Sequence, residues 1–276
     1  MMQTPARQDL SLIAEDARSY RLPRPNQIRH DAGDVVLFHA PLMAYWGGNA
    51  SRIRFDRSSA DRRIGEVRDW FAECGRDGFL WTVGASATPG DVVKRLLGRG
   101  AYPDPEDPTL TPMVLDHEPP PAPDHVAVRP VETFADFRLL WEIDLEAFDA
   151  PETDREDLRA GLAEEWQHFL TDAQDFAYLA TIDGEPVACG RLDLRTPGAG
   201  YLAGGATLPA ARGRGAYRAL VRARWDEAVR LGSPALIVQA GKESRPILER
   251  LGFRAGPPIH VLVDHSGITR PSGAST

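Results

Sequence analysis

The sequence predicts a mixed α+β fold in two domains, and three observations lead to this prediction. Strand-like and helix-like patterns alternate over residues 125–264. A stiff, proline-rich linker at 119–124 precedes them. Within residues 1–118, part of the same order of elements recurs. We therefore expect domains at 1–118 and 125–264, each a mostly antiparallel sheet flanked by helices, and a C-terminal tail at 265–276.

The composition is typical of a globular protein. Of the 276 residues, 42% are hydrophobic and 26% are charged. No apolar run reaches the ~18 residues of a membrane span, and the polar segment Gln3–Asp9 does not resemble a signal peptide. We expect a cytoplasmic protein that does not bind a membrane. The net charge of −8 argues against a nucleic-acid partner.

The two cysteines, Cys74 and Cys189, fall in different predicted domains and lack the spacing of a metal site. Free buried thiols are the expected state in a reducing compartment. We predict no metal cofactor.

The first half of the second domain is expected to contain, in order, a strand at 125–130, helices at 133–148 and 156–170, a β-hairpin of 176–182 and 186–194, and a strand at 200–207. Both helices carry apolar residues at helical spacing, and acidic residues open the second one, as the helix dipole favours. The Asp183-Gly184 pair favours a tight hairpin turn.

The second half begins with a helix up to Leu231, because apolar and charged residues occupy opposite faces. Gly232-Ser233-Pro234 ends that helix. A strand buried on both faces, a short helix and a last strand follow at 235–240, 244–251 and 259–263.

The turn between the strand at 200–207 and the following helix predicts an anion site. Gly213 and Gly215 have no Cβ, so the backbone can adopt positive φ and approach a ligand closely. The first N–H groups of the helix point outward there with the positive end of its dipole. Arg212 and Arg214 add positive charge. The spacing does not match a Walker A loop or a dinucleotide-binding fingerprint. The residues therefore predict a cradle for a phosphate or pyrophosphate.

This region resembles the GCN5-related N-acetyltransferase (GNAT) family. Arg212 to Ala216 fit its cofactor motif [RQ]-x-x-G-x-[GA], whereas Tyr217 stands where the family usually has Gly or Ala. Glu249 to Phe253, E-R-L-G-F, match the end of the family's domain. The resemblance covers residues 126–264.

The resemblance implies acetyl-CoA as the cofactor and an amine as the acceptor. The pyrophosphate would accept hydrogen bonds from the backbone at the helix start, and the pantetheine would extend the sheet beside the preceding strand. The implied cofactor-binding residues are Gly205, Ala206, Thr207, Arg212, Gly213, Arg214, Gly215, Ala216, Tyr217 and Arg218. A β-branched residue at Gly215 is expected to occupy the place of the pyrophosphate.

In the family, the strand before the turn splays from its neighbour, and an N–H near a bulge in that strand stabilises the oxyanion. The resemblance implies direct attack by the amine without a covalent enzyme intermediate.

Catalytic groups are where the sequence departs from the family. Leu248 occupies the position of the usual acid, a Tyr, and Gly241 that of an Asn. Neither strand beside the cofactor carries a carboxylate. Tyr201, Asp193 and His260 are weak candidates, because packing, a solvated hairpin carboxylate and a strand-end position, respectively, are the favoured explanations for them. The sequence leaves the catalytic groups unassigned.

The first domain resembles a degenerate copy of the second. Segments 79–84, 90–97 and 111–116 repeat the order strand, helix, strand of 235–264, and Gly47-Gly48-Asn49-Ala50 resembles a strand start in non-catalytic halves of tandem members. The copy lacks the arginine-glycine turn, so cofactor binding is expected only in the second domain. An unrelated α/β partner domain is the alternative.

Two functions remain open. One is an N-acetyltransferase acting on a small-molecule or peptide amine, as a monomer or homodimer. The other is an acyl-CoA-binding regulatory protein without efficient transfer, which the missing Tyr and carboxylate favour.

Overall fold

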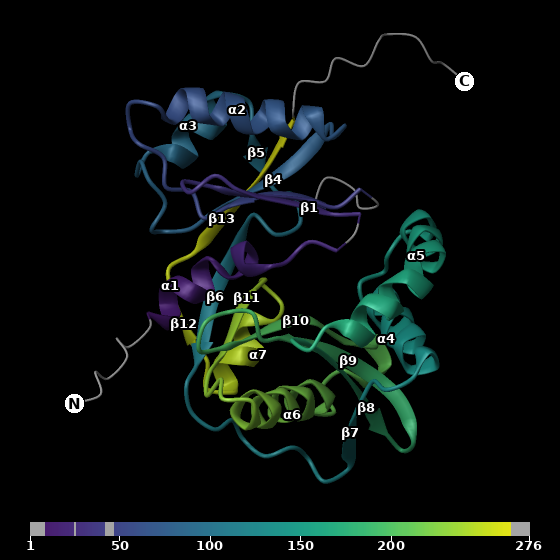
Figure 1. Cartoon of the computed structure of the whole chain (residues 1–276). Helices are drawn as coiled ribbons and strands as arrows, with labels where there is room; N and C mark the ends of the chain where they lie inside the picture. The colour runs from purple at the N-terminus through teal and green to yellow at the C-terminus, as the bar shows by residue number, and fades with distance from the viewer. Residues whose placement is uncertain (1–8, 25, 42–46, 266–276) are drawn as a thin grey trace, which may run out of the picture. The chain divides into compact units, whose positions relative to one another are not determined.

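The computed structural model describes residues 9–24, 26–41 and 47–265. The chain forms two compact units (Figure 1). Among the described residues, the larger unit comprises 9–17 and 112–256, and the smaller unit comprises the described parts of 18–111 and residues 257–265. All but the first residue of the predicted C-terminal tail lies outside the described residues. Each contains a mostly antiparallel sheet with helices packed on it, which confirms the predicted fold class.

The sheet of the larger unit is antiparallel except for one strand pair. Its strands are β7 (Val126–Pro130), β8 (Asp175–Ile182), β9 (Glu185–Asp193), β10 (Gly200–Thr207), β11 (Leu236–Ala240), β12 (Arg254–Ala255) and the part of β6 (Thr109–Leu115) from Pro112 onward. β7 to β10 pair as antiparallel neighbours, and β11 lies parallel to β10. β6 lies beside β11 and pairs with β12.

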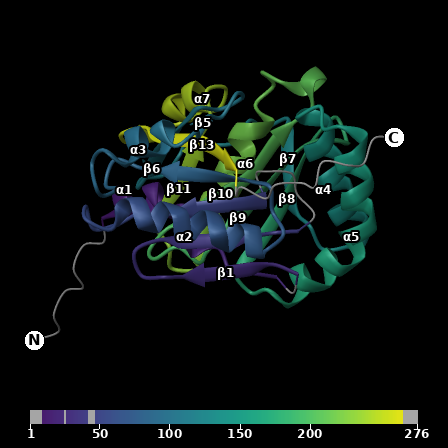
Figure 2. The same ribbon diagram turned by 90° about the horizontal axis from the view of Figure 1, so that it is seen from above.

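Helices cover both faces of this sheet. They are α1 (Leu10–Glu15), α4 (Phe134–Ala147), α5 (Glu152–Thr171), the 3₁₀ turn Pro209–Ala211, α6 (Ala216–Arg230) and α7 (Arg245–Arg250). α4 packs on β8 to β10 with α5 at its side (Figure 2). The opposite face carries α6, because Cys189 contributes to the core with α4 while the neighbouring Gly190 meets Arg224 of α6. No helix in the described ranges has an apolar stretch long enough to cross a membrane.

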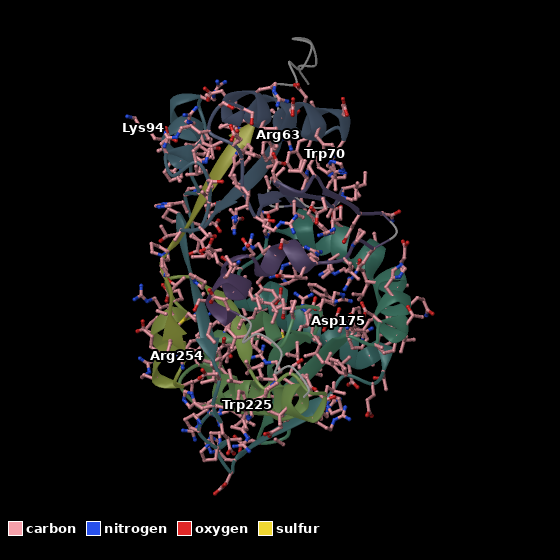
Figure 3. All side chains as sticks on the ribbon, turned by 60° about the vertical axis from the view of Figure 1, so that its left-hand side comes forward. Arg63, Trp70, Lys94, Asp175, Trp225 and Arg254 are labelled. Carbon is pink, nitrogen blue, oxygen red and sulfur yellow. The ribbon has the colours of Figure 1, made fainter. Side chains whose placement is uncertain are left out.

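The smaller unit has β1 (Ile28–Asp31), β2 (Val36–His39), β3 (Gly48–Ser51), β4 (Gly78–Val83), β5 (Tyr102–Pro103) and β13 (Ile259–His265), together with the start of β6. A 3₁₀ turn spans Ala17–Tyr20. Helices α2 (Ala60–Glu73) and α3 (Val92–Gly98) cover one face of the sheet (Figure 1). Figure 3 labels Arg63 and Trp70 on α2, and Trp225 on α6 of the larger unit. The core between α2 and the sheet is aromatic, with the rings of Phe71 and Phe79 stacked at 4.0 Å.

The two units share one order of elements. In the smaller unit β1, β2 and β3 are antiparallel, α2 crosses over, and β4 runs parallel to β3. In the larger unit β8, β9, β10, α6 and β11 repeat this arrangement. The repeat predicted from the sequence is therefore present as two tandem domains of one fold.

The division of the chain differs from the predicted 1–118 and 125–264. β13 pairs with β4 along its length, from His260 opposite Val83 to His265 opposite Gly78, and so belongs to the smaller unit. Helix α1 belongs to the larger unit, where Gln239 Nε2 donates to the carbonyls of Ala14 and Glu15 at 3.2 and 2.7 Å. Since β6 completes the larger sheet, each half of the chain supplies a strand to the other.

Candidate functional site

Strands β10 and β11 diverge after a short paired region. Only Gly200 with Leu236 and Tyr201 with Ile237 are in register. β10 nevertheless continues to Thr207 and β11 to Ala240. The edge of β10 beyond Tyr201 is thus no longer paired with β11, as the resemblance implied.

A bulge lies in this free part of β10. Its pairing with β9 shifts register between Ala203 and Ala206, and Gly204 has a φ of +50°. A Cβ on Gly204 would lie 2.5 Å from Arg191 Nη2, and one on Gly205 would lie 2.8 Å from Tyr217 Cε2. The positive φ of Gly204 favours glycine there, and a Cβ at Gly205 would force the Tyr217 ring to move.

The turn after β10 presents free donors. Gly213 and Gly215 have φ values of +76° and +87°, and α6 begins directly afterwards. Within the described part of the chain, the backbone N–H groups of Gly213 and of residues 215–218 have no hydrogen-bond partner. Arg214 N–H donates to Ala211 O at 3.4 Å, and the helix ladder starts at Ala219 N–H to Gly215 O, 3.1 Å. Five unpaired donors at a helix start are able to bind an anion.

The arginine side chains brace this turn. Arg212 Nη2 donates to Ala147 O at the end of α4 at 3.0 Å, and its Nε reaches Thr207 O at 3.4 Å. Arg214 Nη2 donates to Asp183 at 2.8 Å, while its carbonyl lies 3.0 Å from His125 Nε2. The backbone rather than these guanidinium groups therefore supplies the free donors. Arg218, on the first turn of α6, has a buried Nε without a partner in the described ranges.

The positive φ predicted for Gly215 is confirmed, and the structure adds a second reason for glycine at this position. A Cβ there would lie 2.6 Å from Pro123 Cγ in the proline-rich segment, so a side chain would meet this proline. The space around Gly213 is open, with no neighbouring atom within 4 Å of the position that a Cβ would take. A substitution that probes the anion site belongs at Gly213.

The three catalytic candidates do not gather at the bulge. Tyr201 and Asp193 pair with each other where β10 begins, and Asp193 accepts hydrogen bonds from Arg195 N and Nη1 at 2.8 and 2.7 Å. His260 lies on β13 in the smaller unit. Leu248, at the position of the usual acid, is fully buried in the core.

Sequence reasoning missed an acidic residue on α4. Asp144 lies on the same helical stripe as Leu140 and Trp141, which pack against the sheet. Burial raises the pKa of Asp144, and the positive charge of Arg191 opposes that rise. The sequence did contain a signal for this residue, namely an acidic side chain within the apolar face of a helix. It was overlooked because the search for a carboxylate covered only the two strands beside the cofactor.

A buried arginine lies under the bulge on the α6 side. Arg224 is fully buried; its Nε donates to Leu220 O at 3.0 Å and its Nη1 to Arg191 O at 3.2 Å. Burial lowers its pKa, and the nearby Tyr217 opposes this. A Cβ on Gly190 would lie 2.9 Å from Arg224 Cζ, so this guanidinium requires the glycine above it.

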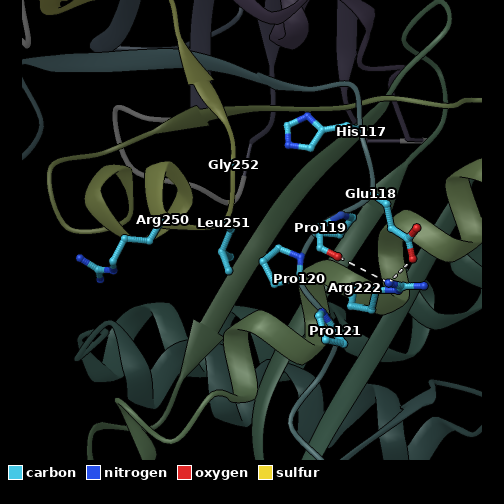
Figure 4. A pocket seen from close by; sticks show the side chains of 9 residues that line it. All are labelled: His117, Glu118, Pro119, Pro120, Pro121, Arg222, Arg250, Leu251 and Gly252. Carbon is cyan, nitrogen blue, oxygen red and sulfur yellow. Dashed lines mark hydrogen bonds and ion pairs between the residues drawn. The ribbon is translucent and has the colours of Figure 1, made fainter.

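Two hollows lie elsewhere. One, in the larger unit, is lined by the segment 117–121, Arg222 and residues 250–252 (Figure 4). Figure 4 shows Arg222 joined to Glu118 and the Pro119 carbonyl, with Arg250 directed away. The second, in the smaller unit, includes His39, Cys74, Arg76 and His265. Neither hollow includes the residues of the turn after β10.

The smaller unit closes the gap that is open in the larger one. After β3 and β4 separate, Phe55 N–H donates to Thr88 O at 3.0 Å and Thr88 N–H donates to Ile53 O at 3.2 Å. These bonds fill the place that corresponds to the splayed edge of β10. Among the described residues of either unit, no group of three His, Cys, Asp or Glu is arranged to hold a metal ion.

Comparisons with known proteins agree with this geometry. Residues 137–253 match the Acetyltransferase (GNAT) family. The chain is similar in structure to a GCN5-related N-acetyltransferase from Kribbella flavida, with a TM-score of 0.68 and 19% identity over 94% of this chain and 96% of that one.

It is also similar to a tandem GNAT protein from the clavulanic acid biosynthesis pathway, with a TM-score of 0.62 and 13% identity over 97% and 91% of the two chains. A third similar structure is a GCN5-related N-acetyltransferase from Sphaerobacter thermophilus, with a TM-score of 0.59 and 18% identity over 84% of this chain and 81% of that one. These identities show a shared fold. No curated protein matches the chain significantly.

Proposed function

We propose that the larger unit, in which residues 137–253 match the Acetyltransferase (GNAT) family, transfers an acetyl group from acetyl-CoA to an amine. The observation that carries the proposal is the set of free N–H groups at Gly213 and residues 215–218, directly after the splayed end of β10. A diphosphate needs several converging donors, and a pantetheine arm needs an unpaired strand edge. Here one continuous segment offers both.

Each part of the segment has a separate task in this proposal. The free N–H groups of the turn bind the pyrophosphate. The edge of β10 at Gly205, Ala206 and Thr207 binds the pantetheine amides, and the bulge presents backbone N–H to the reacting carbonyl. When bound, acetyl-CoA supplies the acetyl group activated as a thioester. The larger unit alone carries this cofactor, because backbone bonds fill the corresponding gap of the smaller unit.

The acceptor that we propose is a small-molecule or peptide amine in the cytoplasm, used by a monomer or homodimer. The acidic net charge of −8 is compatible with a cationic amine. The amine attacks the thioester directly, so proximity supplies a large part of the rate.

A second candidate is an acyl-CoA-binding regulatory protein. Leu248 in place of the usual Tyr favours it, since this buried side chain cannot protonate a leaving thiolate.

Thiol release separates the two candidates. The protein is incubated with acetyl-CoA and spermidine, glucosamine, tyramine or a lysine peptide, while free thiol and acetylated product are followed. We expect release above the amine-free background with at least one amine. Calorimetric binding of acetyl-CoA without release for any amine would support the regulatory candidate, and absence of binding would overturn both.

A further inference from the structure

Helix α4 carries an acid on the face that it turns toward the sheet. Phe137, Leu140 and Ile143 of this face are buried, and Trp141 packs beside them. Asp144 follows Leu140 by four residues and Trp141 by three, so it shares their face. α4 packs against β9 and β10, so this face of the helix lies over those strands.

The strand beneath Asp144 is the one that faces the bulge. Cys189 pairs with Ala206 and Arg191 pairs with Ala203, and the irregular residues of β10 lie between these two pairs. Both β9 side chains point toward α4, since Cys189 lies in the α4 core and Arg191 stacks over Trp141 at 4.5 Å. Asp144 therefore overlooks the part of β10 where the thioester is to react.

This carboxyl has no direct partner within the described ranges. Its side chain makes no hydrogen bond and no ion pair there, although Arg191 is close enough to influence it. Two buried donors of the same region, Trp141 Nε1 and Arg191 Nε, are unpartnered in the described chain, and the Arg191 guanidinium lies over the Trp141 ring. Unpaired buried donors are costly, so these two nitrogens favour a ligand on this side of the sheet.

We propose that Asp144 is the general base that takes a proton from the acceptor ammonium above the β10 bulge. This inference rests on the proposed transferase function. It supplies the carboxylate that the two cofactor strands lack.

The step balances without a further reactant. One proton passes from the ammonium to the Asp144 carboxylate, and the freed lone pair forms the C–N bond to the carbonyl carbon. The C–S bond breaks, and its electron pair leaves with sulfur. A second proton passes from the attacking nitrogen to the thiolate. Asp144 then releases its proton to solvent.

The surroundings make the Asp144 carboxylate a stronger base than a solvated one. Burial raises the pKa of Asp144, and a carboxylate with a raised pKa is a stronger proton acceptor. Arg191 is the charged group that faces it, and limits this rise. The Cys189 thiol is the other titratable neighbour; burial and Asp144 raise its pKa to about 12, so it stays neutral.

The test compares Asp144→Asn with Glu142→Gln, a variant at an exposed position of the same helix. With an amine that the wild type acetylates, we expect Asp144→Asn to lower kcat/KM about 100-fold or more. The acidic limb of the pH–rate profile should disappear, while the dissociation constant of acetyl-CoA changes less than twofold. Glu142→Gln should leave kcat/KM, the acidic limb and the dissociation constant of acetyl-CoA unchanged. Asp144→Glu, which keeps a carboxylate, should retain the acidic limb with reduced activity.

Two results would overturn the proposal. One is an Asp144→Asn enzyme with wild-type activity and an unchanged pH profile. The other is a loss of acetyl-CoA binding and melting temperature in parallel with activity, since that pattern means a structural role. If Asp144→Asn does not fold, an Asp144→Glu profile without an acidic limb is decisive against the base. A wild-type protein that acetylates no amine refutes the transferase function itself, and this outcome is distinct from the other two.

Discussion

At the scale of single residues, two large side chains under the sheet are matched by two glycines above them. Tyr217 departs from the family's usual Gly or Ala, and Gly205 leaves room for its ring. Arg224 is matched in the same way by Gly190. The departure at Tyr217 is therefore compensated within the fold, which the sequence alone did not reveal because the two members are distant along the chain.

A double-mutant cycle tests this match. Gly205→Ala places a Cβ 2.8 Å from the Tyr217 ring, and overpacking of this kind costs about 1–3 kcal/mol of unfolding free energy. In a Tyr217→Ala background most of that cost should vanish. Urea denaturation measures all four proteins. Gly65→Ala, in an open part of α2, is the control and should stabilise by roughly 0.5–1 kcal/mol. Equal costs of Gly205→Ala in both backgrounds would disprove the match.

The stability of Asp144→Asn should depend on pH with a defined sign. Folding raises the pKa of Asp144, so its contribution is favourable below the pKa of the unfolded chain, about 4. It is lost as pH rises through the folded-state pKa. Asn does not titrate, so the variant should gain stability over wild type between acid and neutral pH. Thermal melts at pH 3 and pH 7 measure this gain, and a constant difference would contradict the expected burial.

At the scale of elements, the strand–turn–helix segment joins two properties. The turn supplies donors because Gly213 and Gly215 adopt positive φ, and β10 supplies an edge because it leaves β11 after Tyr201. The side chains of Arg212 and Arg214 hold the turn in place. Ligand affinity should accordingly depend more on the electrostatics around Gly213 than on either arginine.

A matched pair of substitutions at Gly213 tests this site. Asn and Asp have similar shapes and both tolerate positive φ, and the Cβ position is open. Gly213→Asp adds a negative charge beside the pyrophosphate and should weaken acetyl-CoA about tenfold relative to Gly213→Asn, on the order of 1–2 kcal/mol. Calorimetry at two salt concentrations measures both, and the difference should shrink at high salt. Equal affinities would locate the cofactor elsewhere.

Most of the helices and strands of the larger unit were predictable from local sequence patterns. β7 to β11, α4 and α6 carry clear periodicity and firm turn signals such as Asp183-Gly184, and all are confirmed close to their predicted bounds. β3 (Gly48–Ser51) consists of small or polar residues and was indicated only by the resemblance of Gly47–Ala50 to a strand start, whereas β1 is mostly exposed and carried no signal. Asp144 was missed because its meaning depends on the strand beneath it.

At the scale of the whole molecule, the exchange of β6 and β13 could not be predicted. A buried strand has the same apolar pattern whichever sheet it joins, and pairing over such sequence distance leaves no local signal. Three hydrogen bonds to one carboxylate hold β13 in the smaller unit. Buried Asp264 accepts from Arg68 Nε and Nη2 at 3.0 and 2.9 Å and from Trp81 Nε1 at 2.8 Å.

Removal of this anchor should weaken the smaller unit strongly. Asp264→Ala leaves Arg68 and the Trp81 indole without their partner, which costs about 3–5 kcal/mol for a buried pair. Asp61→Ala, which breaks an exposed ion pair with Arg95 in the same unit, should cost less than about 1 kcal/mol. Denaturant unfolding followed by tryptophan fluorescence compares them. A cost for Asp264→Ala no larger than that of Asp61→Ala would mean that β13 does not depend on this bond.

The strand exchange also sets the order in which the chain can mature during its synthesis. β4 leaves the ribosome early, yet its neighbour β13 is made only after all of residues 112–256. At roughly 5–20 residues per second, this delay is on the order of ten seconds or more. Throughout that interval an apolar strand edge has no neighbour, so the nascent smaller unit is a natural client for a chaperone that shields exposed strands.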